Sequence, residues 1–324
     1  MKKCMLCLIT VGLIFIVTAC QTASGEDEAQ LSSDPSPVNT LVVPSQTSEL
    51  QVTAIPSNTP TPEATVIPTA TPVVVLPPEP IEILFQASDG QELSGLYYPA
   101  DENPAAVVVL MPWAQGNQSE WEEVAYWLQG RGLLVRAQNS RQTWKSSNWY
   151  PERTLDMPLG VFTFNFRSCE SVEGCVSYLP VEWLLDAQAA LETAAQLEGI
   201  DPGQILAVGA SIGADGAVNS CAWLNKTELG KCLGAFALSP FSSLTIDFRV
   251  SVDSLLDQED PAPVYCLFGL QDDAASETCG DFPEIRAVNF GYIDDHGLEL
   301  IHVDRRPAPL NILQEFILEA LGGE

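Results

Sequence analysis

Basic residues are scarce in this 324-residue chain. It has 14 lysines and arginines against 43 aspartates and glutamates, which gives a formal net charge of -29 at pH 7. Nucleic acids and anionic lipid headgroups are bound through basic surfaces, so this charge argues against both as partners. Solubility outside the cell is the simpler account of the excess acid.

Histidine is almost absent, and the cysteines lack the spacing of a metal site. The only histidines are His296 and His302, and no cysteine beyond residue 20 belongs to a Cys-x-x-Cys pair. Structural zinc sites use such pairs, usually with histidine, so thiolate metal binding is not expected. We expect neither a metal nor a cofactor, and a catalytic base would have to be one of the two histidines.

The apolar run at residues 6–17 is short for a bilayer-spanning helix, and no basic stop signal follows it. It comes after Lys2 and Lys3 and leads into Val17-Thr18-Ala19-Cys20, which is typical of a secretory signal. The segment resembles a bacterial lipoprotein signal. This resemblance implies a signal peptide at 1–19, cleavage before Cys20, a diacylglycerol on the Cys20 sulfur, and an extracytoplasmic, membrane-anchored protein.

Composition changes after the signal and again near residue 80. Residues 21–80 hold 11 of the 24 prolines and no lysine or arginine. Such a segment cannot bury enough apolar surface to offset its ordering entropy, so we expect residues 20–80 to be a lipidated, extended tether. Residues 81–324 are long enough for one α/β domain, and no second linker interrupts them.

Six cysteines remain after the signal cysteines and Cys20 are set aside. An even number in an exported chain indicates disulfides, and pairing between sequence neighbours is the simplest arrangement. The expected pairs are Cys169 with Cys175, Cys221 with Cys232, and Cys266 with Cys279.

Apolar strands alternate with helices along residues 81–324. Residues 81–85 and 93–98 flank Asp89-Gly90 and predict an antiparallel hairpin. Further strands are expected at 106–111, 133–137, 160–166, 205–208, 232–238, 263–268 and 285–290, and helices at 119–129, 180–197, 212–224 and 310–321. The expected fold class is therefore α/β, a mostly parallel sheet with an antiparallel N-terminal hairpin and helices on both faces.

A sharp turn is predicted where the strand at 205–208 meets the helix at 212–224. The turn reads Gly209-Ala-Ser211-Ile-Gly213, with glycine two residues before and two residues after the serine. A serine that joins a strand to a helix in this way has a strained backbone, and small neighbours prevent collisions. Ser211 is therefore the candidate nucleophile.

A serine hydroxyl needs a base, and the base needs an acid that orients it. His296 stands in the loop Asp294-Asp295-His296-Gly297 after the last expected strand, whereas His302 has the surroundings of a strand or helix interior. Asp272 follows the strand at 263–268 and is the expected acid, with Asp273 as the alternative. The order Ser211, Asp272, His296 is the one that serine hydrolases with this kind of turn use.

From residue 81 onward the chain resembles an α/β-hydrolase of the dienelactone hydrolase or small serine esterase kind. The resemblance rests on the turn at 209–213, Gly-x-x-Asp at 269–272, His296-Gly297, and Phe162-Thr-Phe-Asn-Phe-Arg167, which is similar to the strand before the family's arginine-glycine turn. By alignment it implies an oxyanion hole made by the backbone N–H groups of Ala114 and Ile212.

Two segments depart from the family pattern. Met111-Pro112-Trp113-Ala114 stands where His-Gly is usual, and Arg167-Ser-Cys169-Glu stands where glycines are usual. A disulfide between Cys169 and Cys175 would compensate for the second departure by fixing the turn.

Residues 138–158 are polar and aromatic and have no hydrophobic period. We expect a surface insertion here, and long loops in compact domains are commonly functional. Trp144, Trp149 and Tyr150, together with Trp113, are therefore candidates for the wall of an active-site cleft. Aromatic packing that pins the loop to the domain explains the same residues equally well.

These features predict a monomeric serine hydrolase that acts on a small-molecule ester or acyl substrate through an acyl-enzyme on Ser211. A peptidase-like serine hydrolase is one alternative. Another is a non-catalytic extracellular binding module on a hydrolase scaffold, because a fold does not guarantee activity. A calcium site formed by Asp272, Asp273, Asp294 and Asp295 is the less favoured use of these acids, since no loop has calcium-motif spacing.

Overall fold

The computed structural model describes residues 78–131, 150–171, 173–280, 282–302 and 304–323. The expected signal peptide, Cys20, the tether up to residue 77, the strand at 133–137, Trp144 and Trp149 lie outside these residues. No helix of the described part has both the length and the apolar character needed to cross a membrane.

Eight strands of the described residues form a single sheet. They are β1 (Ile81–Gln86), β2 (Glu92–Tyr98), β3 (Ala105–Met111), β4 (Leu159–Phe164), β5 (Ile200–Ala210), β6 (Cys232–Leu238), β7 (Val264–Phe268) and β8 (Arg286–Asn289). Their spatial order is β1-β2-β4-β3-β5-β6-β7-β8. The strands β1 and β2 pair antiparallel, β2 pairs antiparallel with β4, and every later pairing is parallel. The expected mostly parallel sheet with an antiparallel N-terminal hairpin is confirmed.

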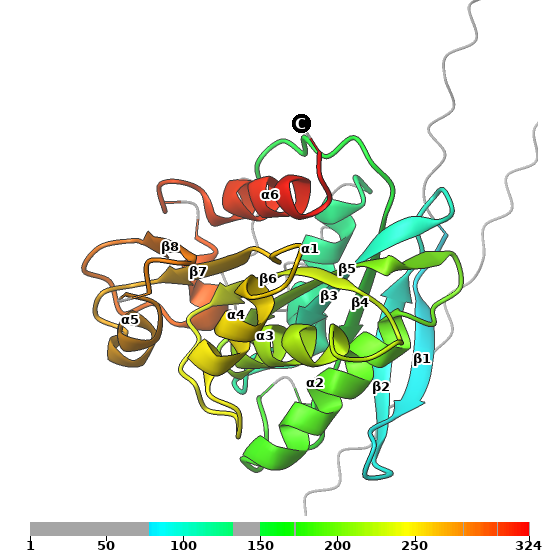
Figure 1. Ribbon diagram of the computed structural model, residues 1–324, viewed down its shortest axis with the longest axis horizontal. Coiled ribbons are helices and arrows are strands. Elements are labelled where there is room, and N and C mark those ends of the chain that lie inside the picture. Colours follow the sequence, from blue (N-terminus) through cyan, green and yellow to red (C-terminus); the bar gives the residue numbers. More distant parts are fainter. Residues whose placement is uncertain (1–77, 132–149, 172, 281, 303, 324) are drawn as a thin grey trace, which may run out of the picture. The chain divides into compact units, whose positions relative to one another are not determined.

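Helices cover both faces of the sheet (Figure 1). They are α1 (Glu122–Leu128), α2 (Pro180–Ala194), α3 (Ile212–Leu224), α4 (Phe248–Leu256), α5 (Asp273–Gly280) and α6 (Pro309–Ala320), with 3-10 turns η1 (Gln118–Trp121) and η3 (Gly297–Leu300). The helices α2 to α5 share one hydrophobic core with the sheet, and α1 and α6 share the other.

The central strand β3 shows why the sheet is buried on both sides. All of its residues are buried, and successive side chains point to opposite faces. Val107 and Val109 pack in the core under α2 and α3, whereas Val108 and Leu110 pack in the core under α1 and α6. A continuous apolar run of this kind is therefore a reliable sign of a two-sided strand.

The structure corrects several expected boundaries. The helix expected at 119–129 begins as η1, because the Asn117 side chain accepts the Ser119 N–H at 2.9 Å and starts a tighter turn. The strand expected at 205–208 already begins at Ile200, and the helix expected at 180–197 ends at Ala194. The helices α4 and α5 were not predicted at all, since both are short and only half apolar.

The three expected disulfides are confirmed. Cys169 is joined to Cys175 in the loop after β4, Cys221 of α3 is joined to Cys232 of β6, and Cys266 of β7 is joined to Cys279 of α5. Each bridge closes a short loop, which restricts the unfolded chain more than the folded one.

Candidate active site

Ser211 lies at the turn between β5 and α3, where the chain leaves the carboxyl edge of the sheet. Its φ is 54° and its ψ is -120°, a conformation that residues with a side chain rarely adopt. A Cβ atom on Gly209 would overlap the carbonyl oxygen of Gly213, and a Cβ atom on Gly213 would overlap that of Met111. The two glycines are therefore required for the turn to close, as the sequence pattern predicts.

A continuous hydrogen-bonded chain joins Ser211, His296 and Asp272. The Ser211 hydroxyl donates to Nε2 of His296 at 2.7 Å, and Nδ1–H of His296 donates to Oδ2 of Asp272 at 2.7 Å. A carboxylate can only accept, which places the imidazole proton on Nδ1 and leaves Nε2 as the acceptor. The side chain of Asp272 is 9% exposed and that of His296 is 27% exposed. This relay of Ser211, His296 and Asp272 is therefore sheltered at the carboxylate and open to solvent at the imidazole.

The loop that carries His296 is fixed from two sides. The backbone N–H of His296 donates to the Glu299 carboxylate at 3.2 Å. Gly297 has a φ of 59°, and a Cβ atom there would lie 2.9 Å from the ring of Trp113. Trp113 therefore packs directly against the turn after the histidine, a contact that the sequence does not reveal.

The positions of the side chains distinguish Asp272 from Asp273 as the acid and His296 from His302 as the base. Asp273 is exposed at the start of α5, whereas Asp272 holds His296. His302 was expected inside a strand or helix, but it lies in the loop after η3, where Nδ1 accepts the Asp304 N–H at 3.1 Å. Asp295, one of the acids considered for calcium, pairs with Arg305.

Three features together define the fold of the domain: the strand order, the antiparallel second strand and a strained serine directly after β5. The domain has the α/β-hydrolase fold. No family model and no curated protein matches this sequence.

Several solved structures are similar in fold. DcsB in complex with its substrate analogue is 12% identical with a TM-score of 0.49, over 76% of this chain and 100% of that chain. The carboxylesterase EstE1, cloned from a metagenomic library, is 14% identical with a TM-score of 0.48, over 77% and 91%. A Pyrococcus furiosus esterase is 14% identical with a TM-score of 0.47, over 74% and 92%.

The expected oxyanion donors belong to two different elements. Ile212 is the first residue of α3, and Ala114 belongs to the turn after β3. Neither backbone N–H donates to another residue of the described ranges, which is what an oxyanion donor requires. The turn is braced by the Trp113 indole N–H, which donates to the buried carboxylate of Glu120. Sequence reasoning missed Glu120.

A second missed residue is Asp215, the only charged residue of α3. Its fully buried carboxylate accepts three successive backbone N–H groups, from Phe241, Ser242 and Ser243, at 3.2, 3.1 and 2.7 Å. Burial raises the pKa of Asp215 against these hydrogen bonds. The clamp holds the loop after β6, so that the Phe241 ring lies 6.0 Å from the His296 ring. A lone acid in an apolar helix was the signal available in the sequence.

The expected aromatic wall is only partly present in the described residues. Trp113 is 4% exposed and lies against Gly297 beside the relay. Tyr150 instead packs against Trp127 of α1, with ring centroids 6.2 Å apart, and burial raises its pKa. Tyr150 therefore serves the alternative role of pinning its loop by aromatic packing.

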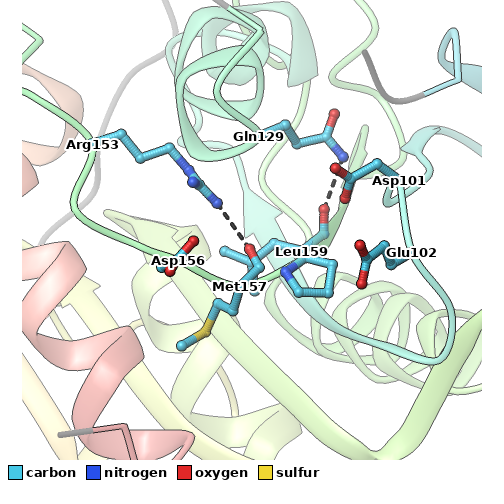
Figure 2. A pocket seen from close by; sticks show the side chains of 8 residues that line it. Asp101, Glu102, Gln129, Arg153, Asp156, Met157 and Leu159 are labelled. Carbon is cyan, nitrogen blue, oxygen red and sulfur yellow. Dashed lines mark hydrogen bonds between the residues drawn. The ribbon is translucent and has the colours of Figure 1, made fainter. Parts of the chain in front are cut away.

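Two cavities differ in their relation to the relay. One, of about 280 Å³, lies at the amino edge of β3 and β4, where Figure 2 shows Arg153 donating to the Met157 carbonyl and Gln129 to that of Leu159. The carboxyl edge carries Ser211, so this cavity lies at the opposite edge from the relay. The other cavity, of about 470 Å³, is lined by Phe241, Phe248, Arg249 and Thr278. Of these lining residues, Phe241 has its ring centroid 6.0 Å from that of His296.

Proposed function

We propose that this domain is a serine hydrolase that cleaves carboxylic esters through an acyl-enzyme on Ser211. The observation that carries the proposal is the unbroken chain of two 2.7 Å hydrogen bonds from Ser211 through His296 to Asp272. A serine held at a strained turn, with a base on one side and free backbone N–H groups on the other, has the parts that acyl transfer needs.

The proposed reaction has two halves. The Ser211 oxygen attacks the ester carbonyl carbon while Nε2 of His296 takes the hydroxyl proton, and the carbonyl electron pair moves onto its oxygen. The N–H groups of Ala114 and Ile212 stabilise that oxyanion. His296 then gives the proton to the leaving alkoxide as the carbon–oxygen bond breaks. A water molecule then attacks the acyl carbon while His296 takes its proton. The bond between the acyl carbon and the Ser211 oxygen breaks as His296 returns that proton to Ser211, which releases the carboxylic acid and restores the enzyme.

The cavity beside Phe241 supports a small-molecule substrate. Its volume of about 470 Å³ lies within the range of small-ligand sites, and two of its walls are phenylalanine rings. Its lining residue Phe241 has its ring centroid 6.0 Å from that of His296, so we infer that an acyl or alcohol group of the substrate extends from the reacting carbonyl toward this cavity.

Covalent labelling with a fluorophosphonate tests the proposal directly. We expect one equivalent of label on Ser211, located by peptide mass spectrometry, and hydrolysis of p-nitrophenyl esters in a series of graded chain length. A peptidase-like enzyme would instead cleave aminoacyl amides and ignore simple esters. A wild-type protein that stays unlabelled beside a labelled control esterase would refute the enzyme and leave a binding module.

We also propose that the protein is a lipoprotein anchored by Cys20 outside the cytoplasm. The pattern Val17-Thr18-Ala19-Cys20 after a short apolar run supports this. Full-length protein expressed in a bacterium is expected to incorporate labelled fatty acid and to fractionate with membranes. Cys20→Ser is expected to lose the label. Unlabelled wild-type protein in the soluble fraction would contradict the anchor.

A further inference from the structure

Two segments that are far apart in sequence lie against each other beside the relay. The first is the oxyanion turn, residues 112–117, and the second is the stapled loop, residues 169–175. The backbone N–H of Cys175 donates to the carbonyl oxygen of Ala114 at 3.0 Å. The Asn117 side chain donates to the carbonyl oxygen of Glu170 at 2.8 Å. The stapled loop is thus bonded to the oxyanion turn at two points, Ala114 and Asn117.

Gly174 brings the two backbones into close contact. It has a φ of 104°, and a Cβ atom on it would lie 2.6 Å from the Ala114 carbonyl oxygen and 3.1 Å from Cα of Gln115. No side chain fits between the stapled loop and the oxyanion turn at this point. The contact therefore depends on the path of the loop and on the absence of a side chain.

The path of the loop is set by the disulfide that closes it. Cys169 and Cys175 are bridged across six residues, and Cys169 is fully buried. Ser168, just before the loop, has a φ of 64°, and its carbonyl oxygen accepts the Val176 N–H at 2.9 Å. A ring of this size leaves the Cys175 N–H few orientations, so its bond to Ala114 is held in place.

In the described residues the Ala114 carbonyl oxygen has no hydrogen-bond donor besides the Cys175 N–H. Trp113 is fixed by Glu120 and by contact with Gly297. The Ala114 carbonyl belongs to the peptide unit after Ala114 and the Ala114 N–H to the unit before it, so the bond from Cys175 restrains the N–H through the two backbone angles of Ala114. A change in these angles would turn the N–H away from the reacting carbonyl. Catalysis is sensitive to such shifts, because a displacement of about 1 Å can cost roughly 100-fold.

We propose that the stapled loop is a positioning element of the oxyanion hole, in which the Cys169–Cys175 disulfide and Gly174 hold the Ala114 peptide in its working orientation. The proposal rests on the esterase function proposed above. It assigns a role to the departure from the family pattern at Arg167-Ser-Cys169-Glu, where a staple replaces the usual glycines.

Gly174→Ala is the sharpest variant, and Gly90→Ala is its matched control. Both glycines have strongly positive φ, 104° and 92°, but a Cβ atom on Gly90 would meet nothing within 4 Å. We expect Gly174→Ala to lower kcat by about 10- to 100-fold with KM changed less than about threefold, since the oxyanion forms only in the transition state. Gly90→Ala carries the same backbone strain and is expected to keep kcat. Equal kcat values for the two variants would overturn the proposal.

Removal of the disulfide provides a second variant with its own control. Cys169→Ala/Cys175→Ala is expected to lower kcat by roughly 10-fold or more, whereas Cys221→Ala/Cys232→Ala is expected to lower the melting temperature and leave kcat unchanged. The control bridge joins the far end of α3 to the first residue of β6, at the edge of the sheet opposite Ser211. A kcat that falls equally in both double variants would indicate a general stability effect and would refute a special role for the stapled loop.

Amide hydrogen exchange supplies a readout that does not depend on catalysis. Peptides that contain residues 113–117 are expected to exchange faster in Cys169→Ala/Cys175→Ala than in wild type, and at the wild-type rate in Cys221→Ala/Cys232→Ala. Unchanged exchange in the first variant overturns the proposal. A wild type that takes no fluorophosphonate refutes the esterase function instead, so the two failures are distinguishable.

Discussion

Ser211→Ala is expected to lower kcat for ester hydrolysis by about 10⁴- to 10⁶-fold and to abolish fluorophosphonate labelling. The variant removes the atom that would carry the acyl group, so only binding and oxyanion stabilisation remain. Ser211 as a whole is 6% exposed, and the variant removes only its hydroxyl, which is bonded to His296, so no large cavity forms. The folded state is therefore expected to persist. Thermal unfolding checks the fold, and steady-state kinetics with p-nitrophenyl esters measure kcat.

His296→Ala is expected to lower kcat by a similar factor. The double variant Ser211→Ala/His296→Ala is expected to have a kcat only slightly lower than either single variant. Members of a relay act as a unit, so their effects do not add. Asp272→Asn is expected to cost about 10⁴-fold in kcat, because it disturbs the tautomer of the imidazole.

Two neighbours provide matched controls for the relay. His302→Ala and Asp273→Asn replace the same residue types a few positions away, in a loop and at an exposed helix start that do not touch Ser211. Both variants are expected to keep kcat within about twofold of wild type. If His302→Ala inactivates the enzyme and His296→Ala does not, the assignment of the base is wrong.

Local sequence patterns were enough to predict the strands that the structure describes and the sharp turn at Ser211. The runs at β3 and β6 are apolar over their whole length, and each is buried on both faces. Gly209 and Gly213 predict a sharp turn, and the structure gives the reason, because a Cβ atom at either position would overlap backbone atoms. Strand ends at one edge of a parallel sheet lie close together, so chain order alone placed Asp272 and His296 near the serine.

Contacts that depend on tertiary packing were not predictable in the same way. Nothing near Trp113 in the sequence indicates that its ring packs on Gly297 or that its indole N–H bonds Glu120. The clamp of Asp215 on the loop after β6 joins residues about 26 positions apart. The contact between Gly174 and Ala114 spans a still larger separation. Sequence patterns report periodicity and turns, whereas these contacts follow from how the elements meet.

Arg167, in the turn after β4, carries a guanidinium that is bonded to several carboxylates. Its guanidinium donates to Asp186 at 2.7 and 2.9 Å and to Asp89 at 2.6 and 3.0 Å, and Glu182 lies 3.3 Å away. The Asp186 side chain is fully buried and also accepts the Arg167 backbone N–H at 2.9 Å. Arg167 thus ties the β1–β2 turn to α2 at the point where the stapled loop begins.

Arg167→Met is expected to lower the free energy of unfolding by about 3–5 kcal/mol, which is a large share of the stability of an ordinary domain. The loss arises because the Asp186 carboxylate would be left buried without a cation. Burial already raises the pKa of Asp186, and the hydrogen bonds and charge of Arg167 oppose that rise. Urea unfolding followed by circular dichroism measures the change.

The penalty of Arg167→Met is also expected to depend on pH. Without Arg167, the folded pKa of Asp186 lies well above its ordinary value of 3.8, so the folded state binds a proton that the unfolded state has released. The stability of the variant then falls as pH rises through the folded pKa of Asp186. The difference in unfolding free energy between wild type and variant is therefore smallest near pH 4 and widens toward neutral pH. Arg286→Met is the control, because Arg286 and its ion-pair partner Glu315 are both 52% exposed, and such a pair contributes about 1 kcal/mol or less. Arg286 also donates to the Tyr265 hydroxyl at 2.7 Å, and the variant leaves no buried carboxylate without a cation. The difference in unfolding free energy between wild type and Arg167→Met should exceed that between wild type and Arg286→Met, and it should widen as pH rises. A smaller difference, or one that narrows with rising pH, would contradict the proposed stabilisation of the buried Asp186 carboxylate by Arg167.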